Sequence, residues 1–271
     1  MLKECITTSI DKTLLFRFLL ASLQLQHVLR AKGDDNMRKA LNELPSTPDE
    51  AFETILRRIE EQERHSATTA MRTLTWCYYS RRPLKMDELR QALVVEDGHH
   101  SLESNGKSAT SVIDSCLSFV THDQSTGGVR FIHPSVQRWF NCEPQNQKLL
   151  APDYLAKTCL TYLNFNVFDV PIDVSWGFRR EDVMSQYIGS YPFYGYAAQF
   201  WGDHTRETEQ GPTVQRASIE FLESENRRTF MLKIAALLEN EEYISGQTVL
   251  RVAASNGLAT VCLKLVNGDV K

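Results

Sequence analysis

The segment from Arg81 to Phe140 constrains the fold more than any other part of this 271-residue chain. Its apolar residues recur first at helical spacing and then alternate as they do in strands. The pattern predicts helix, helix, strand, strand and helix over residues 86–95, 111–118, 119–123, 129–133 and 135–141. Between the two strands, Gly127 and Gly128 supply the positive φ angles that a hairpin turn needs.

A compact helical domain with one small hairpin at its edge has the element order of a winged helix. Such a domain grips DNA or serves as a packing joint in a larger protein. For DNA, the helix before the hairpin enters the major groove and needs Arg, Lys, Asn or Gln. Here that helix, 111–118, has no positive charge, and the turn at 123–128 lacks Lys and Arg. The net charge of −4 also disfavours a polyanion binder, so we expect a packing joint and no DNA binding.

The rest of the chain is predicted to be helical, over residues 12–30, 35–42, 49–65, 67–80, 152–166, 192–207, 213–225, 226–240 and 246–257. Ser46 or Thr47 can cap the helix at 49–65, with Pro48 at an early helical position. Residues 167–191 are the least regular. The expected fold class is mainly α: a helical bundle with a winged-helix domain carrying one small β-hairpin, followed by an α-helical spacer.

Composition and cysteine usage indicate a globular intracellular protein. Hydrophobic residues make up 42% of the chain and charged residues 24%. The six cysteines form no Cys-x-x-Cys pair. The N-terminus lacks the long apolar core of a signal peptide, and the most apolar window, 14–25, is too short to span a bilayer. We therefore expect a reducing, cytoplasmic location, with the nucleus as the alternative, and no membrane association.

Motifs that carry catalysis or cofactor binding are missing from the sequence. It contains no G-x-x-x-x-G-K-[ST] phosphate cradle, so no nucleotide is expected. It contains no G-x-S-x-G nucleophile elbow, H-E-x-x-H zinc motif or EF-hand loop. We predict no catalytic, cofactor-binding or metal-binding residues, no cofactor, and no enzymatic activity.

Several polar clusters have a functional and a structural interpretation, and the structural one is favoured for each. His99-His100 could bind a metal, but adjacent side chains in a polar loop point apart, which favours a solvated loop. His133 could pair with Asp114 or Asp123, but a hydrogen bond at a helix start is favoured. The acidic run at 60–63 is interpreted as a solvated helix face.

Two further groups are interpreted in the same way. Arg81, Arg82 and Lys85 lie at a helix end, where cations offset the helix dipole. Aromatic residues concentrate between 187 and 201, namely Tyr187, Tyr191, Phe193, Tyr194, Tyr196, Phe200 and Trp201. They could form a partner-binding patch, but a helix core with amphipathic edges is preferred.

Four blocks of sequence resemble the fungal proteins in which a NACHT-type ATPase domain is followed by a winged helix, a helical spacer and ankyrin repeats. The first block comprises Phe16–Leu25, Arg38–Leu41, Leu44-Pro45 and Asp49–Leu56, and is similar to the end of the ATPase module. The second and third comprise Arg82–Leu84, Asp87–Leu89, Ala92-Leu93, Ile113–Val120, Val129–His133 and Ser135-Val136. These two resemble the winged-helix module also associated with GPI inositol-deacylase. The fourth comprises Tyr191–Phe193, Tyr196–Ala198, Trp201 and His204, and is similar to the family's spacer helix.

The segment 248–257 resembles the start of an ankyrin repeat, T-P-L-H-x-A. Thr248, Leu250 and Ala253 match, whereas Val249 replaces proline and Arg251 replaces histidine. Two interpretations stay open for the last part of the chain. It is either a partial ankyrin repeat or a terminal helical hairpin that docks on the spacer.

The resemblance implies four parts, at residues 1–65 (end of the ATPase module), 66–142 (winged helix), 143–245 (helical spacer) and 246–271 (ankyrin-like hairpin). It implies a non-catalytic scaffold fragment, STAND-like in type, that contacts protein partners. The alternatives are a transcription-linked regulator that uses the winged helix on DNA, and an unrecognised enzyme.

Overall fold

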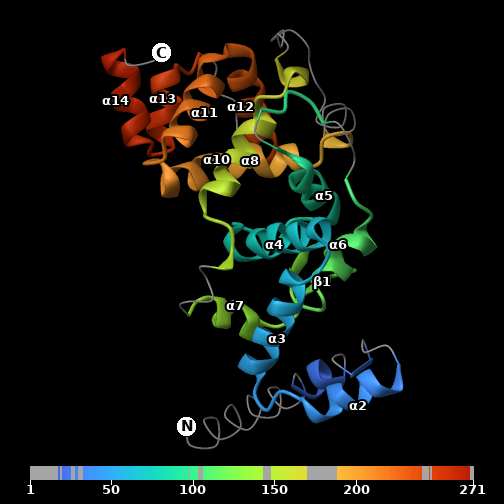
Figure 1. Cartoon of the computed structure of the whole chain (residues 1–271). Coiled ribbons are helices and arrows are strands. Elements are labelled where there is room, and N and C mark those ends of the chain that lie inside the picture. The colour runs from blue at the N-terminus through green and yellow to red at the C-terminus, as the bar shows by residue number, and fades with distance from the viewer. Residues whose placement is uncertain are drawn as a thin grey trace, which may run out of the picture. The chain divides into compact units, whose positions relative to one another are not determined.

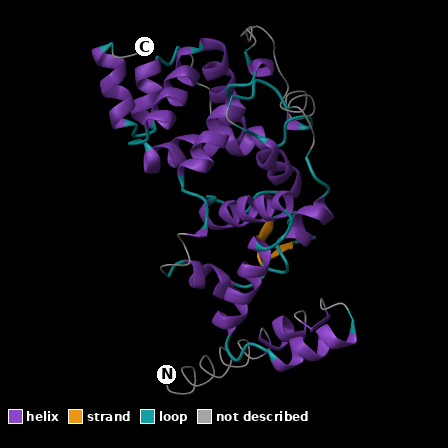
Figure 2. Ribbon diagram, viewed as in Figure 1, coloured by secondary structure: helices purple, strands orange, loops and turns teal. Residues whose placement is uncertain are grey.

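The computed structural model describes residues 33–96, 98–102, 106–142, 148–169, 188–239 and 246–268, together with 18, 20–25, 28, 29 and 244. These residues form a mainly helical fold with a small two-stranded antiparallel sheet (Figures 1 and 2). The chain divides into two compact units, Met1–Ala67 and Thr68–Lys271. Each unit is described by itself.

The first unit contains α2 (Asp34–Asn42) and α3 (Pro48–Glu60). As predicted, Thr47 caps α3: its Oγ1 accepts a hydrogen bond from Glu50 N at 3.2 Å. The helix ends at Glu60, five residues before its predicted end. Residues 20–25, 28 and 29 are helical, as expected for 12–30, and the other residues of that prediction lie outside the described part.

The hairpin region of the second unit comprises α4 (Arg64–Tyr79), α5 (Met86–Val94), α6 (Ala109–Ser115), β1 (Val120–His122), β2 (Val129–Phe131) and α7 (Pro134–Phe140). All of these elements were predicted. The two strands pair antiparallel, with Thr121 opposite Arg130. An extended segment before α5 adds to β2, because Val129 N donates to Leu84 O at 2.8 Å. Gly127 has the predicted positive φ of 69°, but Gly128 does not, so one glycine suffices for the turn.

The link between α6 and β1 differs from prediction. The helix ends at Ser115, three residues early, because Leu117 and Ser118 adopt positive φ angles of 45° and 79°. Left-handed backbone is unfavourable for residues with a Cβ. Here it turns the chain so that Cys116 and Phe119 are both fully buried.

A helical array follows, formed by α8 (Asp153–Leu163), the 3₁₀ turn η2 (Asn166–Phe168), α10 (Phe193–Thr208), α11 (Pro212–Glu223), α12 (Glu225–Glu239), α13 (Val249–Ser255) and α14 (Ala259–Asn267). Helix α10 contacts α5, α8, α11 and α12, so it lies at the centre of the array. The predicted helix 152–166 stops at Leu163 and resumes as η2. Most of the irregular segment 167–191 lies outside the described residues.

Aromatic side chains form the core around α10. Trp76 makes edge-to-face contacts with Phe193 and Tyr196, at centroid distances of 5.4 and 5.6 Å. Phe168 and Phe230 stack at 5.6 Å. These residues are buried. The preferred interpretation of the aromatic stretch 187–201 as a helix core is therefore confirmed for its described residues; Tyr187 lies outside them.

Helices α13 and α14 form a hairpin that contacts α11 (Figure 1). Thr248 Oγ1 caps α13 by accepting a hydrogen bond from Arg251 N at 3.3 Å. The face toward the array buries Val252, Leu258 and Val261 completely. A helix pair is common to the ankyrin and the terminal-hairpin interpretations. Among the residues that the structure describes, every helix is too short or too polar to cross a bilayer.

Candidate functional site

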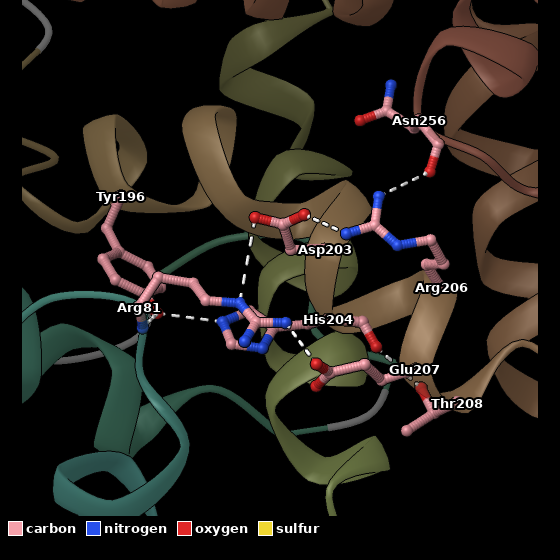
Figure 3. A network of polar contacts seen from close by, with 8 residues as sticks. All are labelled: Arg81, Tyr196, Asp203, His204, Arg206, Glu207, Thr208 and Asn256. Carbon is pink, nitrogen blue, oxygen red and sulfur yellow. Dashed lines mark hydrogen bonds and ion pairs between the residues drawn. The ribbon is translucent and has the colours of Figure 1, made fainter.

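Eight polar residues on and around α10 connect three parts of the second unit (Figure 3). We call this set the Arg81 network; it comprises Arg81, Tyr196, Asp203, His204, Arg206, Glu207, Thr208 and Asn256. Arg81 follows α4 in the hairpin region, and Asn256 ends α13. The other six residues lie on α10. Helix α10 thus carries polar groups directed toward the segment after α4 and toward the end of α13.

The centre of the network is a chain of two hydrogen bonds. Tyr196 Oη accepts from the backbone N–H of Arg81 at 3.0 Å and lies 2.9 Å from His204 Nε2. The tautomer of His204 sets which of these two side chains donates in the second hydrogen bond.

Burial sets the ionisation of this pair. His204 is only 2% exposed, and this burial, followed by the nearby charge of Arg81, lowers its pKa to about 4. Burial also raises the pKa of the Tyr196 phenol well above its usual range. Both side chains are thus held neutral at physiological pH.

Charged groups surround the buried pair. The Arg81 guanidinium forms an ion pair with Glu207 and lies 3.8 Å from Asp203. The hydrogen bond to Glu207 raises the pKa of Arg81. Asp203 also pairs with Arg206 at 2.5 Å, so its carboxylate lies between two cations.

The C-terminal end of α10 also holds the α13–α14 hairpin. Arg206 Nη1 donates to Asn256 O at 3.3 Å. Glu209, which is 6% exposed, accepts a hydrogen bond from Val261 N at 2.9 Å. Leu258, at the N-cap position of α14, has no side chain that can cap the helix. The carboxylate of Glu209 serves as the N-terminal cap instead.

A second ion pair lies next to the network. Arg82 binds the two carboxylate oxygens of Glu88 at 2.7 and 2.8 Å, and Glu88 also accepts from Lys85 N at 2.7 Å. The Arg82 guanidinium lies 5.2 Å from the centre of the Tyr196 ring. Arg81 and Arg82 therefore make specific pairs with acidic residues, which the expected role of offsetting a helix dipole did not include.

The structure also shows where the other candidate residues from the sequence lie. His133 caps α7 as predicted, since its Nδ1 accepts a hydrogen bond from Ser135 N at 3.1 Å. Glu60, Glu61 and Glu63 are exposed, as expected for a solvated face. His99 and His100 lie in a solvent-accessible loop, as expected, and both line one cavity beside α8 and α11.

The Arg81 network was missed by sequence reasoning. Tyr196 and His204 belong to the fourth resembling block, which is the one signal that pointed to them. In the network each polar group is paired with another residue of the fold. The arrangement links α10 to the segment after α4 and to the end of α13.

Comparison with protein-family models, curated proteins and solved structures finds no match for this chain. In the described part of the chain, no group of three His, Cys, Asp or Glu residues is arranged to hold a metal ion.

Proposed function

We propose that this chain is a non-catalytic scaffold that joins a winged-helix domain to a helical array and presents the end of that array to a protein partner. The observation that carries the proposal is the Arg81 network. Its polar groups connect α10 to the hairpin region on one side and to α13 on the other. Groups with such partners contribute to geometry and specificity of packing.

The α14 helix supplies the surface that a partner would cover. Leu263 is 63% exposed and Val266 is 67% exposed, whereas Val261 on the same helix is fully buried. We call Leu263 and Val266 the α14 strip. Residues three apart lie on one helix face, so Leu263 and Val266 adjoin on the exposed face of α14. This exposed apolar pair offers a partner helix a surface to pack against.

The resemblance to fungal NACHT–ankyrin proteins supports the same function. In that family a winged helix and a spacer connect an ATPase module to a repeat array. Repeats of this kind bury their faces against neighbouring repeats. By this analogy, the α13–α14 hairpin is the first unit of such an array, and its partner surface is another helical pair.

Proximity labelling in cells, with the full chain as bait, tests the proposal. The double variant Leu263→Glu, Val266→Glu places two charges on the α14 strip. The labelling of a defined set of proteins should be lost, while the circular dichroism and the unfolding midpoint of the chain stay unchanged. The matched control is Leu41→Glu, an equivalent change at a residue that is 53% exposed in the first unit.

The opposite results would reject the scaffold. If the double variant labels the same proteins as the native chain, the α14 strip is not the partner surface. Measurable ATP hydrolysis by the purified chain removes the non-catalytic assignment. Tight, salt-sensitive binding to duplex DNA, measured at two salt concentrations, would favour the DNA-binding alternative instead.

A further inference from the structure

A cleft of about 260 Å³ lies between α8, α11 and the loop at residues 98–100. We call it the basic cleft, and its polar lining includes His99, His100, Lys157, Asn164, Arg216 and Glu220. The loop is fixed in place, because Asn166 N donates to His100 O at 2.9 Å and His99 N donates to Glu96 O at 3.1 Å. The wall that carries the two histidines is therefore part of the fold.

Hydrogen-bond donors dominate the polar lining of the cleft. Lys157 and Arg216 carry positive charge and only donate, and each imidazole has at least one N–H. The side-chain oxygen of Asn164 already accepts from Arg227 Nη1 at 3.4 Å, which leaves its NH₂ group as the donor. Two threonine hydroxyls, of Thr161 and Thr213, and the carboxylate of Glu220 complete the polar lining. With donors in the majority, the lining favours a ligand that is rich in acceptors.

We propose that the basic cleft binds a phosphate group. A phosphate monoester carries close to two negative charges and three strong acceptor oxygens, and arginine is the side chain best shaped to bind it. Arg216 is exposed, so its guanidinium is accessible to a ligand. Lys157 is partly neutralised by Asp153, which lies 2.7 Å away, so Arg216 is the principal cation of the site.

Two other ligand classes fit the cleft less well. A metal ion would need clustered ligands, and the described residues provide no group of three His, Cys, Asp or Glu for one. Glu220 opposes an anion, which leaves the cleft with two permanent positive charges and one negative charge. That balance suits a single phosphate group better than an extended polyanion.

Titration of the full chain with inorganic phosphate, followed by calorimetry and by amide shifts in NMR, tests the proposal. We expect saturable binding with amide shifts at residues of α8 and α11. Arg216→Gln should weaken binding about tenfold, the loss of one charge-assisted contact. Glu220→Gln should strengthen it about threefold by removing a repulsive charge. A variant that only disturbed the fold would not bind phosphate more tightly.

Arg251→Gln is the matched control, because Arg251 is exposed on α13 and outside the cleft. It removes the same charge and should leave the affinity unchanged. The proposal fails if phosphate binding is not saturable, if Arg251→Gln weakens it as much as Arg216→Gln, or if Glu220→Gln leaves it unchanged.

Peptide titrations then distinguish the source of the phosphate. A short phosphoserine peptide, its unphosphorylated form and inorganic phosphate are compared on the same protein. Tighter binding of the phosphopeptide than of inorganic phosphate assigns the cleft to a phosphorylated protein segment. Equal affinities assign it to a free phosphate or a small phosphorylated molecule. Binding of the unphosphorylated peptide with equal affinity would overturn the proposal.

Discussion

Gly202 on α10 lies directly against the side chain of Asn256 at the end of α13. A Cβ at position 202 would overlap Asn256 Oδ1 and lie 2.5 Å from Cγ and 2.9 Å from Cβ of that residue. The two helices approach this closely because position 202 has no side chain. The contact fixes where the α13–α14 hairpin docks on α10, beside the hydrogen bond from Arg206 to Asn256 O.

Gly202→Ala is therefore expected to destabilise the second unit. Helix propensity favours alanine by about 1 kcal/mol, but overpacking costs about 1–3 kcal/mol, so the net loss should be about 0–2 kcal/mol. The control is Gly195→Ala on the same helix, where the added Cβ meets only Leu238 Cδ1 at 3.3 Å. Urea denaturation should show that Gly195→Ala is neutral or stabilising. Equal effects of the two substitutions would contradict the close contact.

Glu209→Ala should loosen α14. It removes the acceptor of the buried Val261 N–H, at a cost of about 1–2 kcal/mol. Glu209→Gln keeps a carbonyl oxygen and should cost less. Hydrogen exchange measures the effect, with faster exchange expected in α14 and little change in α8. Glu223→Ala, at an exposed position on α11, is the control and should leave α14 unaffected.

His204 makes stability depend on pH. Its pKa is about 4 in the fold and near 6.5 when unfolded, so the unfolded chain takes up a proton first as the pH falls. The contribution of this residue is fully present above pH 6.5 and is lost progressively down to about pH 4. The full loss is of the order of 3 kcal/mol.

The test is the difference between the native chain and His204→Gln in unfolding free energy, measured from pH 7.5 to pH 4. The slope should be reduced in the variant. Identical slopes for the two proteins would show that burial does not hold His204 in its neutral form.

The Arg82–Glu88 pair should contribute strongly to stability at the start of α5. The Glu88 side chain is 8% exposed and Arg82 is 35% exposed. Glu88→Gln leaves the guanidinium without its countercharge, and we expect a loss of about 2 kcal/mol, reduced from the fully buried case by solvent at Arg82.

The neighbouring pair of Asp87 and Arg90 provides the comparison. Asp87 is 72% exposed in that pair, so Asp87→Asn should change the unfolding midpoint very little. Thermal unfolding of the two variants measures the difference. A large effect of Asp87→Asn, or none of Glu88→Gln, would contradict the importance of burial for these pairs.

Local signals in the sequence predicted the elements well. Pro48 after Thr47 indicated a helix start, and the alternation around Gly127 indicated the hairpin, because both depend on a few neighbouring residues. The end of α6 was wrong, since the left-handed angles of Leu117 and Ser118 depend on burial of the residues beside them. Such burial is a property of the folded chain.

The site was much less predictable. Arg81 and His204 are 123 positions apart in the sequence, and Glu209 meets Val261 N from 52 positions away. Nothing in the spacing of these residues marks them as neighbours. Gly202 in the middle of a helical pattern was the clearest local sign of a close approach, because an interior glycine weakens a helix unless packing requires it.

Through the α14 strip, the proposed partner would couple its own concentration to the stability of the α13–α14 pair. A partner that covers Leu263 and Val266 binds only when α14 is formed, so binding energy adds to the stability of that helix. At a partner concentration one hundred times its dissociation constant, the gain is about 2.7 kcal/mol. If the proposed function holds, the helix pair becomes more ordered as the concentration of the partner rises.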